Sequence, residues 1–385
     1  MHTFTRGIVS VALLSTAALA LAGCSPTTSA DPTVSAGPSE SSSAATTTTP
    51  SASPIAFGTA PSRAGIPACD ALLPADLVQA LVPGAKPVDT LVDTPDIAGA
   101  WAFAATAGGT DCESANSVSA IDEVLPTTKD DPAYQGVRLT VLPDAAADFV
   151  DAQTSATSPE VAATTVRCDA SDSARVYCGG AVRAGTAWVD IRSVRLQDTV
   201  DATPEVSEPA FKSLLAATAA AVEGSALGSA TTEHGAPDGS YTTCDATNVN
   251  AVASKDLADP DTRGGDASAG LQQYAMNRLG GSSCVFEAQG AGEQPYAITG
   301  AVYSVVPGGG WVVERRLDAG TIDRADRVEL DGLPAGAAAW RSCTDLACSV
   351  DVVDDGDWTH FVLYERVADE PSDGVVRWAE ASLAG

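Results

Sequence analysis

The chain has 385 residues, and 45% of them are hydrophobic, which is enough for packed cores of ordinary size. Acidic residues outnumber basic ones by 50 to 21, which gives a formal net charge of -29. Because a polyanion repels other anions, this charge argues against a nucleic-acid partner and against binding to anionic lipid headgroups.

An apolar segment that ends in a cysteine opens the chain. Arg6 precedes an apolar run over residues 8–22, which is short for a helix that spans a hydrocarbon core of about 30 Å. The run ends in Leu21-Ala22-Gly23-Cys24, and such small residues are typical of a signal-peptide cleavage site. The tetrad resembles the bacterial lipobox, which implies that Cys24 is lipidated and becomes the first mature residue. The alternative is an ordinary signal peptide followed by a cysteine by chance.

We therefore expect residues 1–23 to be removed and the protein to be lipid-anchored on the extracytoplasmic face of the cell membrane. Two or three acyl chains would anchor it stably, because each buried methylene contributes about 0.8 kcal/mol. Residues 24–62 are mostly Ser, Thr, Ala, Pro and Gly. Such a segment cannot bury enough apolar area to fold, so we predict a disordered stalk. Its composition also suits O-glycosylation, although low complexity alone explains it.

Eight cysteines follow Cys24, an even number that predicts disulfides in an oxidising compartment. They form two sets of four, and each member of the first set recurs 170 to 175 positions later in the second. This repeat favours bonds within each set: Cys69 with Cys112, Cys168 with Cys178, Cys244 with Cys284, and Cys343 with Cys348. Zinc binding is the alternative, but the sequence contains no Cys-x-x-Cys pair.

The repeated spacing predicts two related domains, at residues 63–228 and 236–385, joined by a linker at residues 229–235. Local matches support the repeat, since Cys69-Asp70-Ala71 corresponds to Cys244-Asp245-Ala246. The segment from Gly108 to Cys112 likewise corresponds to the segment from Gly280 to Cys284.

In the first domain, hydrophobic periodicity predicts helices at residues 77–81 and 145–153 and a closing helix from about Ser207 to Gly224. It predicts strands at residues 137–141, around Cys168 and Cys178, and at residues 187–192. Trp101 and Phe103 alternate with small residues, which predicts a further strand before Cys112.

The second domain repeats this order of elements. The expected helices lie at residues 271–278, 311–317 and 375–383, and the expected strands at residues 285–288, 297–306 and 359–366 and on either side of Cys343 and Cys348. Helices and hairpins do not alternate as βαβ units, so the fold class is α+β. We expect each domain to be an antiparallel sheet with helices on one face, in which the closely spaced cysteine pair joins the two strands of a hairpin.

The sequence contains no recognised catalytic or cofactor motif, so we expect no cofactor and assign no catalytic residue. His234 falls in the linker and His360 in a predicted strand, so no two histidines have the spacing of metal ligands on a helix. Both are expected to be surface or packing residues. Serine-hydrolase, P-loop and zinc-protease motifs are missing as well. Glycoside hydrolysis by a pair of carboxylates stays an alternative, because any two of the 50 acidic residues could meet in space.

Two acidic clusters are weak candidates for calcium sites. One holds Asp256, Asp259, Asp261 and Asp266, and the other holds Asp351, Asp354, Asp355 and Asp357. Neither has the spacing of an EF-hand, and Asp355-Gly356 suits a tight turn. We therefore predict no metal. The run Gly308-Gly309-Gly310-Trp311 is a weak candidate for a phosphate cradle, a loop whose backbone N–H groups bind a phosphate. A flexible loop is the favoured interpretation.

The two predicted domains resemble those of actinobacterial cell-envelope lipoproteins of unknown function. The domain of those proteins opens with Cys-x-Leu-Leu and later shows Gly-x-x-Cys-x-Trp. The corresponding residues are Cys69-Asp70-Ala71-Leu72-Leu73 and Gly109-Thr110-Asp111-Cys112-Glu113-Ser114, without the tryptophan. In the second domain Phe286 takes the aromatic position after Cys284. The resemblance implies an envelope location and supplies no catalytic residues.

The function expected from these features is that of a non-enzymatic binding or interaction module of the cell envelope. Its partners would be the membrane, through the lipid anchor, and a cell-wall or protein ligand. Two similar domains would suit bivalent binding. One alternative is an envelope hydrolase that uses paired carboxylates, and another is a structural spacer protein of the cell wall.

Overall fold

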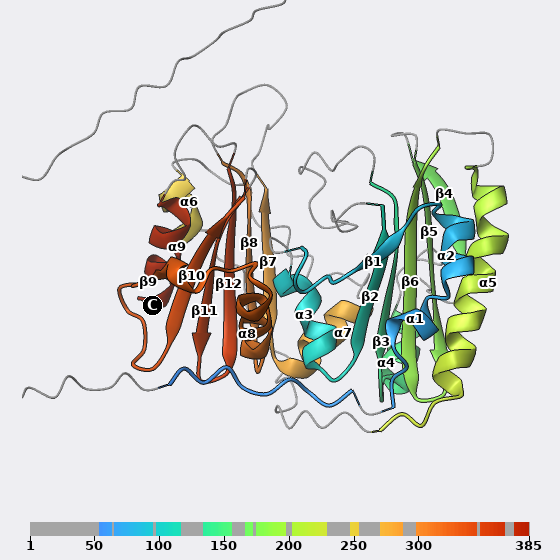
Figure 1. Ribbon diagram of the computed structural model, residues 1–385, viewed down its shortest axis with the longest axis horizontal. Helices are drawn as coiled ribbons and strands as arrows, with labels where there is room; N and C mark the ends of the chain where they lie inside the picture. Colours follow the sequence, from blue (N-terminus) through green and yellow to red (C-terminus); the bar gives the residue numbers. More distant parts are fainter. Residues whose placement is uncertain are drawn as a thin grey trace, which may run out of the picture. The chain divides into compact units, whose positions relative to one another are not determined.

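Figure 1 shows the computed structural model of the chain. The structure describes residues 54–63, 65–94, 98–116, 134–155, 166–171, 175–197, 202–228, 247–253, 270–287, 298–344, 347–365 and 373–384. Residues 52–385 form one compact unit. Cys24, the predicted signal peptide and the predicted linker at residues 229–235 lie outside the described residues. Among the described helices, none is long and apolar enough to cross a membrane.

The first described sheet has six strands in the order β1-β2-β3-β6-β5-β4. All neighbouring strands are antiparallel. The strands are β1 (Lys86–Val88), β2 (Thr110–Ala115), β3 (Gly136–Leu142), β4 (Arg167–Ser171), β5 (Arg175–Ala184) and β6 (Ala187–Leu196).

The second described sheet also has six strands, in the order β7-β8-β12-β11-β10-β9, and is antiparallel throughout. The strands are β7 (Ser282–Glu287), β8 (Ile298–Val306), β9 (Arg327–Val328), β10 (Ala338–Cys343), β11 (Ala347–Asp354) and β12 (Asp357–Glu365). The predicted α+β class with antiparallel sheets is therefore confirmed.

Five strands have the same order in both sheets, since β2-β3-β6-β5-β4 corresponds to β7-β8-β12-β11-β10. The register agrees as well. Trp188 pairs with Leu142 directly after the β5–β6 turn, and Trp358 pairs with Val306 directly after the β11–β12 turn. Descent of the two halves from one repeated domain stays a prediction, but the topology of these five strands is the same in both sheets.

The outer face of each sheet carries helices from its own half of the chain. In the first half, α5 (Pro204–Glu223) packs on β4, β5 and β6 and contacts α1 (Cys69–Leu72) and α2 (Ala75–Leu81). Thr203 caps α5 by accepting a hydrogen bond from the Val206 N–H, and Phe211, Leu214 and Leu215 are buried against the sheet. In the second half, α9 (Gly374–Leu383) packs on β11 and β12 and contacts α6 (Thr247–Ala253).

The expectation that helices cover one face of each sheet is wrong, because helices cover the opposite faces as well. Helix α3 (Ala98–Thr106) packs on β2 and β3, on β8 of the second sheet, and on α7 (Leu271–Leu279). Helix α7 packs on β3 and β6 of the first sheet. One buried hydrophobic cluster therefore contains Phe103 and Trp188 together with Val306 and Trp358. On these faces, α4 (Ala146–Ser155) contacts β6, and α8 (Gly310–Ala319) contacts β11 and β12.

The prediction of a strand at Trp101 and Phe103 is wrong, because both residues belong to α3. The alternation of large and small residues arises because the helix is apolar on most sides and fits between two layers. Its hydrophobic residues therefore show no single preferred face.

Three of the predicted disulfides are present: Cys69–Cys112, Cys168–Cys178 and Cys343–Cys348. The second and third each join directly paired residues, on β4–β5 and on β10–β11, as expected for a disulfide within a hairpin. Cys284 is also disulfide-bonded, and its predicted partner Cys244 lies outside the described residues.

Candidate functional site

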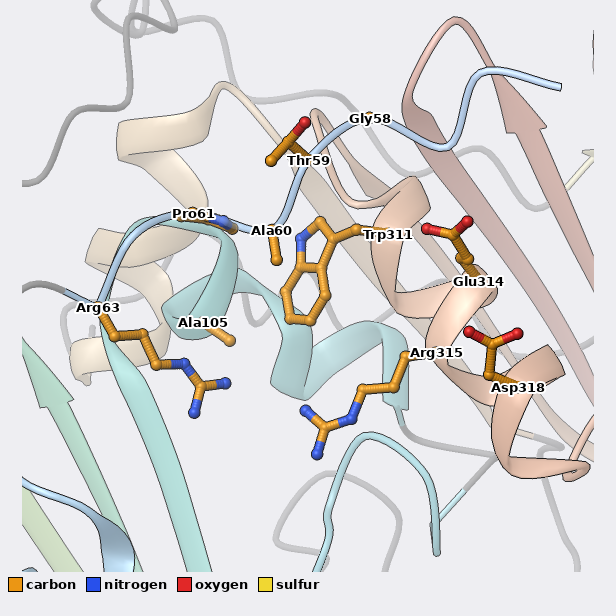
Figure 2. Close-up of a pocket in the computed structure, with 10 residues that line it drawn as sticks. All are labelled: Gly58, Thr59, Ala60, Pro61, Arg63, Ala105, Trp311, Glu314, Arg315 and Asp318. Atoms are coloured by element: carbon orange, nitrogen blue, oxygen red, sulfur yellow. The ribbon is translucent and has the colours of Figure 1, made fainter. Parts of the chain in front are cut away.

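A pocket of about 530 Å³ lies between helix α8 and the extended chain at the start of the described structure (Figure 2). We call it the α8 pocket, and we call residues 54–63 the strap. The pocket is lined by Gly58, Thr59, Ala60, Pro61, Arg63, Ala105, Trp311, Glu314, Arg315 and Asp318.

One face of α8 supplies four of the lining residues. Trp311, Glu314, Arg315 and Asp318 follow the spacing i, i+3, i+4, i+7, which places them along one side of a helix. Figure 2 shows the guanidinium groups of Arg315 and Arg63 on one side of the Trp311 indole and the two carboxylates on the other. The pocket therefore presents cations and anions at different places around one aromatic wall.

The strap is held against the second half by close packing, so the prediction that residues 24–62 are disordered is wrong for residues 54–62. The Phe57 ring stacks on Trp340 with centroids 5.8 Å apart. A Cβ at Gly310 would lie 2.8 Å from the carbonyl oxygen of Phe57 and 2.9 Å from that of Gly356. Only glycine therefore lets α8 begin this close to the strap and to the β11–β12 turn.

The glycine run before α8 is not a phosphate cradle, because its backbone N–H groups are already bonded. Gly308 donates to the Asp357 carboxylate at 2.7 Å, Gly309 to the Val306 carbonyl at 2.9 Å, and Gly310 to the Gly356 carbonyl at 2.8 Å. The flexible-loop interpretation is also wrong, since this segment is a bonded helix start.

The two arginines of the α8 pocket interact with each other electrostatically. Partial burial lowers the pKa of Arg63, the positive charge of Arg315 lowers it further, and Asp89 and Asp111 partly offset both effects. Arg63 donates one hydrogen bond to Thr110 Oγ1 at 3.5 Å, and Arg315 forms an ion pair with Asp89. A guanidinium carries five N–H donors, so both groups keep donors for a ligand.

The acidic side of the pocket is more exposed. Asp318 pairs with Arg324 at 2.6 Å, and both side chains are more than half exposed. Glu314 is exposed, and no hydrogen bond or ion pair joins its carboxylate to another described residue. Glu314 is therefore the carboxylate in the pocket that is most accessible to a cationic group.

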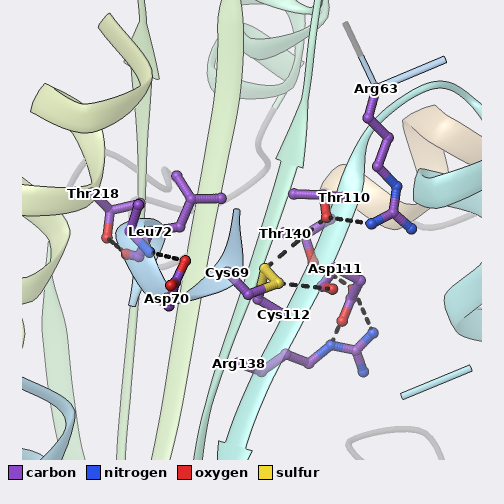
Figure 3. Close-up of a disulfide and its surroundings, with 11 residues drawn as sticks. Arg63, Cys69, Asp70, Leu72, Thr110, Asp111, Cys112, Arg138, Thr140 and Thr218 are labelled. Carbon is purple, nitrogen blue, oxygen red and sulfur yellow. Dashed lines mark hydrogen bonds and ion pairs between the residues drawn. A yellow bond between two sulfur atoms is a disulfide. The ribbon is translucent and has the colours of Figure 1, made fainter. Parts of the chain in front are cut away.

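Next to Arg63, the inner face of the first sheet carries a second group of charged residues, of which Figure 3 shows Asp111 and Arg138. We call Asp111, Glu113, Arg138 and Asp190 the inner-face cluster. Asp111 Oδ2 accepts hydrogen bonds from Arg138 at 2.6 Å, from Thr140 at 3.0 Å, and from Gln272 of α7 at 3.2 Å. The Trp101 ring lies over the Arg138 guanidinium, 2.9 Å from its central carbon.

Burial dominates the acid–base properties of Glu113 and Asp190. It raises the pKa of Glu113 to about 7, against the opposing charge of Arg138 and a 2.8 Å hydrogen bond from Tyr134. It also raises the pKa of Asp190 to about 7. Several buried polar atoms here lack a hydrogen-bond partner among the described residues: Trp101 Nε1, Asp111 Oδ1, Glu113 Oε2, Arg138 Nη1 and Gln272 Oε1.

The second sheet carries a fully buried network around Asp351. Its Oδ1 accepts hydrogen bonds from Arg316 Nη1 at 2.9 Å and Trp358 Nε1 at 2.9 Å, and lies 2.8 Å from His360 Nδ1. Burial raises the pKa of Asp351, but the charges of Arg316 and His360 and hydrogen bonds from His360 and Trp358 lower it more, so the net pKa lies below its usual value. His360 is thus a packing residue of the core, one of the two roles expected for it.

The described part of the chain contains no group of three His, Cys, Asp or Glu residues that could hold a metal ion. Asp351 is buried in its network, while Asp355 and Gly356 form the β11–β12 turn, with φ values of 47° and 89°. The turn interpretation of this acidic segment is therefore confirmed. His234 and the cluster from Asp256 to Asp266 lie outside the described residues.

The α8 pocket was not predicted from the sequence. The four-residue stripe on α8 was a detectable signal, but its partners on the strap and on α3 lie more than 200 positions away in sequence. Comparisons with protein-family models, with curated proteins and with solved structures found no match to this chain.

Proposed function

We propose that this chain is an exported lipoprotein, anchored by Cys24 on the extracytoplasmic face of the cell membrane, whose body binds a small ligand in the α8 pocket. The lipobox-like tetrad and the low-complexity stalk support the anchoring. The resemblance to actinobacterial envelope lipoproteins and the disulfides support an oxidising, extracytoplasmic location.

One observation carries the binding role: the α8 pocket combines an aromatic wall with charged groups that keep unused hydrogen-bonding capacity. Trp311 is 6% exposed, and Arg63, Glu314 and Arg315 surround it. A pocket of a few hundred cubic ångströms with a few convergent polar groups is the usual form of a small-molecule site.

The positions of the acidic residues favour binding over glycoside hydrolysis. A carboxylic acid that donates a proton near neutral pH needs a raised pKa. Among the described residues, the carboxyls with that property belong to Glu113 and Asp190, which lie in the inner-face cluster and do not line the α8 pocket. The proposed role is accordingly that of a binding protein.

The anchoring is tested by fractionating cells that express the full chain. We expect wild-type protein in the membrane fraction with incorporated palmitate label, and Cys24→Ala in the soluble fraction without label. Ser29→Ala, a small change in the same segment, should behave as wild type. Palmitate label retained by Cys24→Ala would contradict the lipid anchor.

The binding role is tested by a thermal-shift screen of the full chain in detergent against small carboxylates, phosphates, sugars and peptides. We expect at least one class to stabilise the wild type and not Arg315→Gln. Arg377→Gln, at an exposed position on α9, is the matched control and should respond as wild type. If no class gives a shift that depends on Arg315, the pocket is not a binding site.

A further inference from the structure

We infer that the α8 pocket binds a zwitterion of the amino-acid type, a free amino acid or a short peptide. The ligand carboxylate would lie against Arg63 and Arg315 and its ammonium group against Glu314. This inference rests on the proposed binding function and specifies the ligand class of the same site.

The arginine side of the pocket suits a carboxylate. The two guanidinium groups are close enough for Arg315 to disfavour the charge of Arg63, and Asp89 and Asp111 offset only part of the combined effect of burial and Arg315. An anion between the two guanidinium groups would favour the charge of both. A carboxylate matches the planar donor fork of a guanidinium and accepts bidentate hydrogen bonds from it.

The acidic side of the pocket suits an ammonium group. Glu314 and Arg315 are adjacent in α8, so their side chains leave the helix about 100° apart, and Figure 2 shows the Glu314 carboxylate away from the Arg315 guanidinium. Asp318, one turn further along the helix, adds negative charge, although its partner Arg324 compensates part of it. A ligand with one charge would satisfy one side of the pocket and leave the other unbalanced.

The strap adds backbone groups that suit a peptide. None of the hydrogen bonds among the described residues uses the backbone of Gly58, Thr59 or Ala60, and all three residues are exposed. This extended chain lines the pocket beside the Trp311 indole. An extended peptide could therefore exchange main-chain hydrogen bonds with the strap, and its side chain could pack on the indole.

The test uses isothermal titration calorimetry on the full chain in detergent at pH 7. The probes are the tripeptide Ala-Phe-Ala with free termini, its N-acetylated form, its C-amidated form, and free phenylalanine. We expect the unblocked tripeptide to bind, and each blocked form to bind about tenfold more weakly, the effect of losing one charge-assisted contact. The phenylalanine arm shows whether a single residue suffices.

Pocket variants assign each charge to its partner. Arg63→Gln and Arg315→Gln should weaken the unblocked tripeptide about tenfold and leave the C-amidated form unchanged, whereas Glu314→Gln should weaken the unblocked tripeptide and leave the N-acetylated form unchanged. The matched controls, Arg377→Gln and Glu223→Gln, lie at exposed helix positions and should change neither.

Two results would overturn the zwitterion inference: an unblocked tripeptide and free phenylalanine that both fail to bind, or blocked forms that bind as tightly as the unblocked one. If the thermal-shift screen still finds a ligand that depends on Arg315, the proposed binding function stands and only the ligand class is wrong. If that screen also fails, both proposals fail.

Discussion

The buried network around Asp351 allows a strong test of what stabilises the second sheet. Arg316, Asp351 and His360 are all 0% exposed, so the Asp351 carboxylate is the charge that balances the Arg316 guanidinium in the core. Asp351→Asn keeps the shape and an accepting oxygen but removes this charge. Breaking a buried ion pair in this way costs about 3 to 5 kcal/mol of the free energy of unfolding. The cost should be at the high end, because Arg316 Nε and Nη2 already lack hydrogen-bond partners among the described residues.

Urea unfolding followed by tryptophan fluorescence measures this loss, because Trp358 donates to Asp351 and Trp340 pairs with it across the sheet. With a denaturant slope near 3 kcal/mol/M, we expect the midpoint of Asp351→Asn to fall by about 1 to 1.7 M. Asp318→Asn, which breaks an exposed pair, is the matched control and should cost less than about 1 kcal/mol.

The double variant Asp351→Asn with Arg316→Met removes both charges and should regain most of the lost stability. Because the folded pKa of Asp351 lies below the usual 3.8, its contribution is complete above about pH 4 and is lost as the pH falls further. A midpoint of Asp351→Asn within about 0.3 M of wild type, or a double variant as unstable as the single one, would refute this account of the network.

Three further predictions concern other parts of the fold. Because burial raises the pKa of Glu113 from 4.5 to about 7, the contribution of Glu113 to the free energy of unfolding should fall by about 3 kcal/mol as the pH rises from 4.5 to 7. Glu113→Gln should remove this part of the loss in urea melts at several pH values, and the part due to Asp190 should stay. Cys69 and Cys112 are 43 positions apart, so replacing both by Ala removes the link that closes this loop and should lower the free energy of unfolding by about 4 kcal/mol on the chain-entropy model. An unchanged melting temperature would contradict this. A Cβ at Gly281 would lie 2.6 Å from the Phe103 ring, so Gly281→Ala should lower the free energy of unfolding by about 1 to 3 kcal/mol. Gly179→Ala is the control and should be tolerated, because a Cβ there meets nothing within 4 Å. Equal melting temperatures for the two variants would show that α3 can shift.

The cysteine spacing predicted the two hairpin disulfides correctly, because the geometry of a hairpin strongly constrains which cysteines can meet. Cys168 and Cys178 are 10 positions apart, and Cys343 and Cys348 are 5 apart, so each pair spans a single turn between neighbouring strands. The strand and helix positions near these pairs also followed from periodicity, because most of these elements have one apolar face against a sheet.

The layer between the sheets could not be predicted in the same way. Helix α3 contacts both sheets and α7, so its sequence is apolar in nearly every direction and carries no helical stripe. The α8 pocket was missed for a related reason. It needs the strap, α3 and α8 together, and single-sequence periodicity says nothing about which distant segments meet.

The matching topology of the two halves does not give each half a pocket. By strand register, Pro143 corresponds to Pro307, and Asp144, with a φ of 51°, corresponds to Gly308, with a φ of 68°. Counting on from there, Ala147 of α4 takes the position of Trp311, and Val150 that of Glu314.

Helix α4 therefore lacks both the aromatic wall and the carboxylate, although its backbone occupies the equivalent place. The bivalent binding that two similar domains suggest is accordingly not expected for this ligand. Calorimetric titration should give one ligand per chain, and Val150→Glu should not create a second site. A stoichiometry of two that Arg315→Gln reduces to one would mean that α4 also forms a binding site, and that the sequence difference between the two helices does not decide where the ligand binds.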